Sequence, residues 1–234
     1  MATSSKSSAV HYFTFSNFEV IGGLDGGTGT STGIGIRIGE SGAGFETLHL
    51  LMTDVIMHHT RGWYGAANAD NDNNVFRRLT IHHNGFPTTR PHGEAMHMTG
   101  HDNTLEDSDI YANEYFGVHW YDPFSYGISN AVIRNNRVHD TGAAGILVAY
   151  GAGNLVYNNL VYGNGAGYPG APGITVGSGT SNRVLNNSIR GGLNDPICVY
   201  VADSGATDLE TTFAGTPGGS RTAGAIPIRC YRTT

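Results

Sequence analysis

The chain has 234 residues with 35 glycines, and only 14% of its residues are charged. This length fits one domain, and the glycine content favours short, tightly wound strands over a helical bundle. A net charge of -6 argues against a general nucleic-acid-binding protein, which needs a basic face, and no apolar run approaches the ~18 residues of a membrane span.

The N-terminal part of the chain predicts a tail followed directly by a strand. Residues 1–9 are rich in serine and are expected to be disordered, and the segment MATSSKSSAVHYF lacks the apolar core of a signal peptide. The segment HYFTFSNFEVIGG then starts a strand without a preceding amphipathic helix. Solenoids normally cap their ends, so we expect a chain cut from a longer one or self-association through uncapped coil ends.

A repeated unit, Asn-x-x-apolar-x-(Asn/Asp/Ser)-x-apolar followed by Gly-apolar-x-apolar, extends from Asn74 to Ala202. Its leading polar residues are Asn74, Asn103, Asn130, Asn154, Asn182 and Asp208, at spacings of 29, 27, 24, 28 and 26 residues. A period in the twenties predicts a solenoid.

The residues within the unit indicate which solenoid this is. Val and Ile alternate with polar residues in short runs that Gly and Asn interrupt, which excludes helical repeats, and the Leu frame of leucine-rich repeats is missing. We therefore predict an all-β, right-handed parallel β-helix of about seven coils over residues 10–208, with three short parallel sheets. Residues 209–234 are predicted to form an irregular C-terminal cover with one strand, AIPIRCY. The predicted inward residues are Val132, Val138, Ile146, Val148, Val156, Val161, Ile174, Val176, Val184 and Ile189.

Polar residues at the coil bends are expected to stack in a ladder of side-chain hydrogen bonds. Stacking the coils places Asp54, Ser108, Asn136, Asn159 and Asn187 in one column. Amides in such a column can bond to each other and to the turn backbone of the next coil, so this column is predicted to be structural.

Outward-facing side chains must carry the function, because the alternate inward ones fill the core. Aligning the coils on Val138, with Ile56 in the equivalent place of the second coil, predicts one outward column, and aligning them on Ile146 predicts another. The first column is Met57, His82, Tyr111, His139, Tyr162 and Arg190. The second is Arg37, Ala67, His97, His119, Leu147, Thr175 and Cys198.

The second, third and fourth coils concentrate residues that can do chemistry. Neighbouring coils lie ~4.8 Å apart, so His97 and His119 should be adjacent, beside the long segments HHTRGWYG and HHNGFPTTRPHGE. The predicted catalytic residues are His97, His119, Tyr121, Arg90, Asp122 and Glu94. The predicted substrate-binding residues are Arg61, His82, His92, Tyr111, His139 and Tyr162. Each of these side chains is also compatible with an ordinary place on a polar surface.

Two groups could ligate a metal ion. Asp70, Asp72 and Asn73 in ANADNDNN resemble a calcium loop, although Asx-rich turns also arise for backbone reasons alone. His97 with His119 could hold zinc if a third ligand joined them. No other cofactor is indicated. Cys198 and Cys230 permit at most one disulfide, which is compatible with a secreted protein.

Phrases such as HMTGHDNTLEDSDIYAN and VIRNNRVHDTGAAGILV, over residues 10–202, resemble the right-handed parallel β-helix proteins of the pectate-lyase-like superfamily. The resemblance implies an extracellular protein with a polysaccharide partner, and this superfamily includes lyases, uronan epimerases, hydrolases and non-catalytic binding proteins. A local likeness to mannuronan C5-epimerases lies in HWYDPF, where Asp122 and Pro123 match the motif Tyr-Gly-x-Asp-Pro-His. His119 stands in place of its Tyr, and Phe124 in place of its His.

Three functional hypotheses remain after this comparison. The first is a lyase that cleaves an acidic polysaccharide by β-elimination; Lys6 is the only lysine, so a histidine, His97 or His119, would be the base. Arg61 or Arg90 would neutralise the uronate, and Tyr121 or a second histidine would be the acid. The second is a glycoside hydrolase with Glu94 and Asp122 as its carboxylate pair. The third is a non-catalytic module for glycan binding or assembly.

Overall fold

The computed structural model describes residues 11–22, 35–38, 48–60, 67–70, 72–85, 93–121, 128–168, 170–190, 197–202, 208–213 and 226–229. All regular secondary structure in these ranges is β-strand. A search of the same ranges for a helix with the length and apolarity to cross a membrane finds none. The strands are β1 (His11–Ile21), β2 (Ile36–Ile38), β3 (Leu48–His58), β4 (Ala67–Asp70), β5 (Val75–Arg77), β6 (Thr80–His82), β7 (Met96–His101), β8 (Thr104–Glu106), β9 (Asp109–Tyr111), β10 (Val118–Tyr121), β11 (Ile128–Ser129), β12 (Val132–Arg134), β13 (Arg137–His139), β14 (Ile146–Ala149), β15 (Leu155–Tyr157), β16 (Leu160–Tyr162), β17 (Ile174–Gly177), β18 (Arg183–Ile189), β19 (Ile197–Ala202), β20 (Asp208–Phe213) and β21 (Ile226–Arg229).

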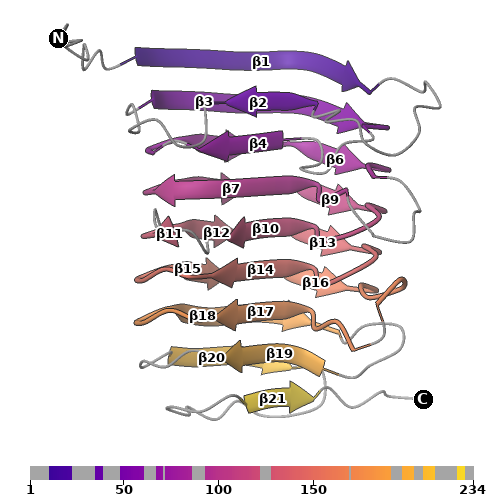
Figure 1. Cartoon of the computed structure of the whole chain (residues 1–234), viewed down its shortest axis with the longest axis vertical. Helices are drawn as coiled ribbons and strands as arrows, with labels where there is room; N and C mark the ends of the chain where they lie inside the picture. The colour runs from indigo at the N-terminus through magenta and orange to yellow at the C-terminus, as the bar shows by residue number, and fades with distance from the viewer. Residues whose placement is uncertain are drawn as a thin grey trace, which may run out of the picture.

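The strands stack into a parallel β-helix with three faces, as predicted (Figure 1). The β10 face contains β2, β4, β7, β10, β14, β17 and β19 in spatial order. The β12 face contains β5, β8, β12 and β15, and the β13 face contains β6, β9, β13 and β16. The longer strands β3 and β18 pass from the β12 face to the β13 face and join these two faces into one sheet.

The core is a column of apolar side chains enclosed by the three faces. Nine of the ten predicted inward residues are buried, and the tenth, Val132, was predicted wrongly. Val132 pairs with Thr104 and Leu155 on the outer side, whereas its neighbour Ile133 is fully buried. The reason is that Ala131, and not Asn130, occupies the leading buried position of this coil, so the strand is displaced by one residue. A shift of one residue in a strand exchanges its inner and outer side chains.

The same kind of displacement affects the second coil. Ile56 was predicted to point inward and Met57 outward, but Ile56 is 40% exposed and Met57 is fully buried. Met57 pairs with Ile81, and His58 pairs with His82, so His58 holds the outward place that was given to Met57. Asp54, which has a positive φ of 58°, forms the bend of this coil and sets the position of the residues that follow it.

Ladders of buried amides hold the bends together. Asn136 Nδ2 donates to Asn159 Oδ1 over 3.0 Å, Asn159 Nδ2 donates to Asn187 Oδ1 over 2.9 Å, and the Ser108 N–H donates to Asn136 Oδ1 over 3.0 Å. The predicted ladder is therefore confirmed for these four residues, all of which are buried. Asp54 does not belong to it. It lies on the surface in an ion pair with Arg78, because the ladder position of its coil is taken by the buried Val55.

Two further ladders occupy the other bends. One contains the pairs Asn74–Asn103 and Asn154–Asn182, and the other contains Thr60–Asn84–Asn113 and Thr141–Asn164. At many bends the residue before the ladder residue has a positive φ, as Asp107, Asn135 and Asn158 do. Asn and Asp tolerate this conformation better than most residues.

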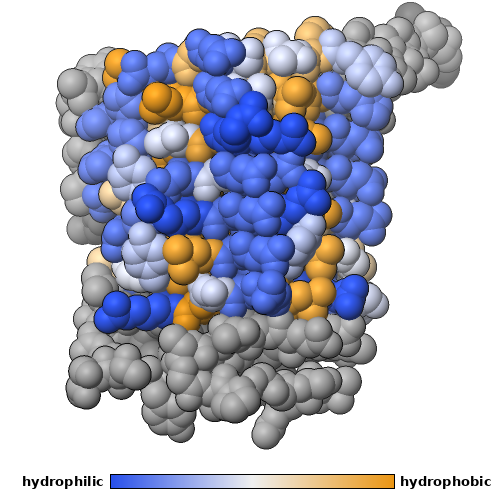
Figure 2. All heavy atoms as spheres, turned by 180° about the vertical axis from the view of Figure 1, so that it is seen from behind, coloured by the Kyte–Doolittle hydropathy of each residue, from blue (hydrophilic) through white to orange (hydrophobic). Residues whose placement is uncertain are grey.

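Seen from behind, hydrophilic side chains form a column along the stack between stripes of hydrophobic ones (Figure 2).

The two ends of the stack differ. β20 pairs in parallel with β18, so parallel stacking continues beyond residue 208, the expected end of the β-helix. The predicted strand AIPIRCY is present as β21, which pairs antiparallel with β19. At the other end a cavity of about 350 Å³ is lined by Phe13, Phe15, Phe18, Ile36, Ile38, Leu50 and Met52. Self-association through this end stays a prediction, and the expected tail at 1–9 lies outside the described residues.

Candidate functional site

His97 and His119 lie side by side on the β10 face, as predicted. His97 in β7 and His119 in β10 are direct neighbours in the parallel register, and the residue before each, Met96 or Val118, is fully buried. The two imidazole rings are 4.9 Å apart between centroids and nearly perpendicular, at 89°. The alternation of the strand thus places both rings on the outer side of neighbouring coils.

Other members of this outward column were predicted partly wrongly. Leu147 and Thr175 continue it beyond His119. However, Asn68 and not Ala67 pairs with His97, and Tyr200 and not Cys198 pairs with Thr175. In both strands the prediction misplaced the register, because the preceding loop varies in length and the repeat does not show at which residue the strand starts.

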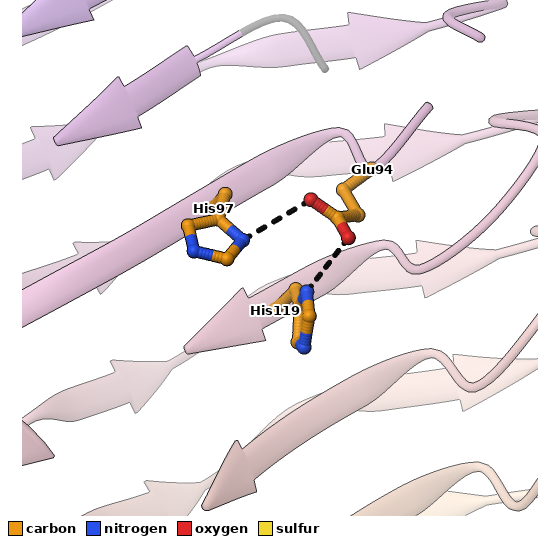
Figure 3. A group of neighbouring side chains, drawn as sticks. All are labelled: Glu94, His97 and His119. Carbon is orange, nitrogen blue, oxygen red and sulfur yellow. Dashed lines mark hydrogen bonds and ion pairs between the residues drawn. The ribbon is translucent and has the colours of Figure 1, made fainter. Parts of the chain in front are cut away.

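Glu94 connects the two histidines. It precedes β7 and is buried, and its carboxylate accepts a hydrogen bond from each ring: Oε2 lies 3.1 Å from Nδ1 of His97, and Oε1 lies 2.8 Å from Nδ1 of His119 (Figure 3). A carboxylate accepts only when each nitrogen carries a proton, so both imidazoles are protonated on Nδ1. Figure 3 shows the Nε2 edge of each ring pointing away from Glu94. We call these three residues the Glu94 site.

The protonation states in the Glu94 site follow from its surroundings. Burial alone would raise the pKa of Glu94, but the hydrogen bonds from His119 and His97 outweigh burial and lower this pKa from 4.5 to about 2. Burial lowers the pKa of His119 below 6.5, and this effect exceeds the attraction of the Glu94 carboxylate. At neutral pH Glu94 is therefore ionised and His119 is a neutral imidazole that can accept a proton.

Aromatic residues surround His119. The ring of Phe116 lies 4.5 Å from it and that of Tyr121 lies 5.0 Å from it, while Tyr150 packs edge-on against Tyr121 at 5.1 Å. Burial and the hydrogen bond with Tyr150 raise the pKa of Tyr121 above 10. The hydroxyl of Tyr121 thus keeps its proton at neutral pH and can donate it.

The Glu94 site is also a group that could hold a metal ion. One ligand atom from each of Glu94, His97 and His119 lies within 4.8 Å of the others. The third ligand that zinc binding would need is Glu94, three residues before His97. Asp70 is the last residue of strand β4, and the Asp72 carboxylate accepts a hydrogen bond from the His101 N–H at 2.7 Å. Calcium binding by these two residues stays a prediction.

Several predicted residues fall outside the described ranges. Arg61, Arg90, His92 and Asp122 belong to this group, so the predicted anion anchor, substrate contact and second carboxylate stay predictions. They occur in the segments that join the β10 face to the rest of each coil.

The outward column of the β13 face is a stack of aromatic rings. His58, His82, Tyr111, His139 and Tyr162 follow one another with centroid separations of 4.9, 5.0, 5.2 and 4.7 Å, at interplanar angles of no more than 17°. The inner rings cover each other's faces, so a sugar could reach them only at their edges. At His139, Nδ1 contacts Asp140 and Nε2 contacts Asp109. Substrate binding by this column stays a prediction.

The match to a family model agrees with the architecture. A family model described as right handed beta helix region matches residues 4–189. The A-module of the Azotobacter vinelandii mannuronan C-5 epimerase AlgE6 is similar, with 17% identity over 70% of this chain and 53% of that chain and a TM-score of 0.42. The crystal structure of the Dettilon tailspike protein (gp208) is similar with 13% identity over 82% of this chain and 47% of that chain, at a TM-score of 0.39.

This chain spans about half the length of each of these two structures. No curated protein matches the sequence. Similarity at these levels carries no information on the reaction.

Proposed function

Because this chain belongs to the right-handed β-helix family, a fold that hosts several chemistries, we propose from the Glu94 site itself that it is a carbohydrate-active polysaccharide lyase. Its substrate would be an acidic polysaccharide, cleaved by β-elimination. The observation that carries the proposal is the buried Glu94 carboxylate, which accepts a hydrogen bond from Nδ1 of both His97 and His119. An extracellular location belongs to the same proposal.

His119 is the proposed base. Glu94 fixes the proton of His119 on Nδ1, so the lone pair is on Nε2, and the negative charge of Glu94 stabilises the imidazolium that forms when Nε2 takes a proton. This is the logic of a carboxylate–histidine pair in general base catalysis. Burial keeps the imidazole neutral beforehand, so the base is ready at neutral pH. His97 is bound by the same carboxylate and lies next to the imidazole of His119.

The groups at this site account for each proton and electron pair that moves in the elimination. Nε2 of His119 takes the proton from C5 of the uronate, and the electron pair of the C5–H bond forms the C4=C5 double bond. The C4–O4 bond breaks, and O4 leaves with a proton from the Tyr121 hydroxyl, whose ring is 5.0 Å from that of His119. A proton from His119 can then return to Tyr121 through solvent.

The substrate carboxylate needs a positive partner during this reaction. The net charge of -6 repels a polyanion, so the positive charge must be local. Arg61 and Arg90 are the predicted anchors, in the segments that follow the second and third coils of the β13 face. A metal ion at the Glu94 site would be another source of positive charge for the substrate carboxylate. It would exclude the hydrogen bonds described above, because an ion bound at Nδ1 of a histidine would replace the proton that this atom donates to Glu94.

The hydrolase hypothesis receives less support from the site. A glycosidase acid must hold a proton near the working pH, whereas Glu94 has a pKa of about 2 and is buried between two histidines. Glu94 is therefore better suited to orient the histidines than to protonate a glycosidic oxygen.

The test is an incubation with a panel of uronic-acid and neutral polysaccharides, with and without a chelator. A lyase gives ultraviolet absorbance from the C4=C5 double bond. New reducing ends without this absorbance would indicate a hydrolase, and retention of polysaccharide without new ends would indicate a binding module.

Variants locate the activity. His119→Ala should lower the rate by at least ~100-fold, the usual scale of a general base, and shift the melting temperature by no more than a few degrees. Glu94→Gln should also lower the rate, because an amide can accept from one imidazole but must donate to the other. His101→Ala, on the same strand β7, is the matched control and should keep full activity. Full activity in the His97→Ala, His119→Ala double variant would rule this site out.

A further inference from the structure

A row of aromatic rings crosses the β10 face at the Glu94 site. In spatial order it contains Tyr168, Tyr115, Phe116, His119, Tyr121 and Tyr150, and successive ring centroids lie 5.2, 4.1, 4.5, 5.0 and 5.1 Å apart. His119 and Tyr121 are two residues apart in β10, so the row follows this strand and crosses the long axis of the stack (Figure 1). We call these six residues the aromatic row.

One end of the row is formed by a loop that folds back across a neighbouring coil. Tyr168 lies between β16 and β17, two coils beyond Tyr115. The N–H groups of Gly167 and Tyr168 donate to the carbonyl of Gly142, in the coil between them, over 2.9 and 3.1 Å. A Cβ on Gly142 would lie 2.0 Å from the carbonyl oxygen of Glu114, so this close packing requires glycine. The loop therefore brings Tyr168 to Tyr115.

The other end of the row is Tyr150, whose backbone conformation is rare for a tyrosine. Its φ is 64°, and most other described non-glycine residues with a positive φ are Asn, Asp or Ser. Ala149 pairs with Gly177, so the equivalent residue of the next coil is Ser178, whose φ is 54°. A large side chain is disfavoured in this conformation, and such departures gather at functional sites. Tyr150 is 40% exposed, so filling the core does not explain its ring.

The rings at both ends of the row meet their neighbours at steep angles. Tyr150 meets Tyr121 at 83°, and Tyr168 meets Tyr115 at 62°. In the parallel stack of the β13 face the inner rings cover each other on both sides, whereas an edge contact covers one face of one ring. A pyranose has an apolar C–H face and a polar rim, so it fits a tyrosine that offers an open ring face and a hydroxyl.

We propose that the aromatic row binds the polysaccharide chain, whose consecutive pyranose rings pack on it along β10. The direction of the chain rests on the proposed lyase function. In that reaction Tyr121 protonates O4, and O4 remains on the sugar that leaves. The leaving sugar therefore lies on the Tyr150 side of Tyr121. The uronate that forms the double bond lies on the His119 side, and the sugars beyond it extend toward Tyr168.

The first experiment is a calorimetric titration of the full chain with hexasaccharides of polygalacturonate and of polymannuronate. The Glu94→Gln background keeps every ring of the row and slows cleavage during the titration. In this background Tyr150→Asn and Tyr168→Ala should each weaken binding by at least ~10-fold. Ser178→Asn places the same residue at the equivalent bend one coil away, so it is the matched control and should leave the affinity unchanged. Because Asn tolerates a positive φ, Tyr150→Asn should lower the melting temperature by no more than about 2 °C.

The second experiment maps cleavage of a hexasaccharide labelled at its reducing end, with Glu94 unchanged. In Tyr150→Asn the leaving sugar is bound more weakly, so the substrate moves toward Tyr168 and the labelled unsaturated product becomes longer. Tyr168→Ala weakens the opposite end, so the labelled product should become shorter. Opposite shifts in the two variants are the expected result.

The two experiments separate binding from cleavage. The aromatic row is overturned as the binding site if neither hexasaccharide binds, if either Tyr150→Asn or Tyr168→Ala binds as tightly as the background, or if Ser178→Asn weakens binding equally. The direction of the chain is overturned if the two variants shift the products the same way or not at all. Binding that depends on Tyr150 and Tyr168 without any cleavage would support the aromatic row and overturn the lyase function.

Discussion

The amide ladder gives a quantitative prediction for Asn159→Leu. Asn159 is 2% exposed, and its Oδ1 accepts from both the backbone N–H and the Nδ2 of Asn136 over 3.0 Å. Its Nδ2 donates to the carbonyl of Ile133 and to Asn187 Oδ1, both over 2.9 Å. Leucine has the same number of side-chain heavy atoms and the same branching at Cγ, so it is the apolar replacement closest in shape, and the loss of the hydrogen bonds is the main change.

The cost follows from the groups that lose a partner. Asn136 Nδ2 still reaches the carbonyl of Leu105 at 3.0 Å, and Asn187 Oδ1 keeps the backbone N–H of residue 159 at 2.9 Å. The buried N–H of Asn136 loses its acceptor, and the carbonyl of Ile133 loses a donor. Each buried polar group without a partner costs about 1–3 kcal/mol, so the loss of two partners should lower the free energy of unfolding by about 2–6 kcal/mol.

Urea unfolding measures this change, followed by both circular dichroism and fluorescence so that coincident curves justify a two-state treatment. Leu160→Ala is the matched control in the same coil, because Leu160 is 45% exposed and its loss should cost less than about 0.5 kcal/mol. Any activity per folded molecule should be unchanged in both variants. If Asn159→Leu were no less stable than Leu160→Ala, the ladder would not stabilise the fold as argued.

Three other predictions concern the core and the Glu94 site. Val138→Asp places an unpaired charge between Ile110 and Val161 and should unfold the domain; a soluble variant with an unchanged melting curve would contradict the register. The pKa of Glu94 is lowered from 4.5 to about 2, so its stabilisation, about 3 kcal/mol, is complete above pH 4.5 and is lost as the pH falls through 2. Urea titrations of the unmodified chain and Glu94→Gln should therefore converge with falling pH; a constant difference in stability would disprove that the hydrogen bonds to the ionised Glu94 stabilise the fold. If His119 is the base, its lowered pKa means that kcat/KM declines only below pH 6.5, and a midpoint above 6.5 would exclude it.

The repeat in the sequence determined the fold class. Spacings in the twenties, short runs of Val and Ile, and Asn at the bends all follow from one physical requirement: each coil must bury its alternate side chains on those of the next coil. The same requirement predicted that His97 and His119 would be neighbours, because strands in consecutive coils pair directly.

Positions that depend on one-residue steps were decided only by the tertiary structure. Asp54 and Asn130 are short polar residues, like the ladder residues of the other coils. Each has a positive φ and precedes the ladder position, which the buried Val55 or Ala131 occupies instead. A pattern with a period of two cannot reveal such a step, since either phase gives an alternating strand.

The chemistry of the Glu94 site was also decided in three dimensions. Glu94 was recognised as a candidate, but its burial and its double contact with His97 and His119 depend on how the chain enters β7. In the same way, the sequence shows that His58 precedes His59 and His82 precedes His83, whereas the contact between the Nδ1 atoms within each pair depends on the left-handed backbone at His59 and His83. The repeat therefore fixes which residues share a coil position, and the backbone conformation at each bend determines which of their atoms meet.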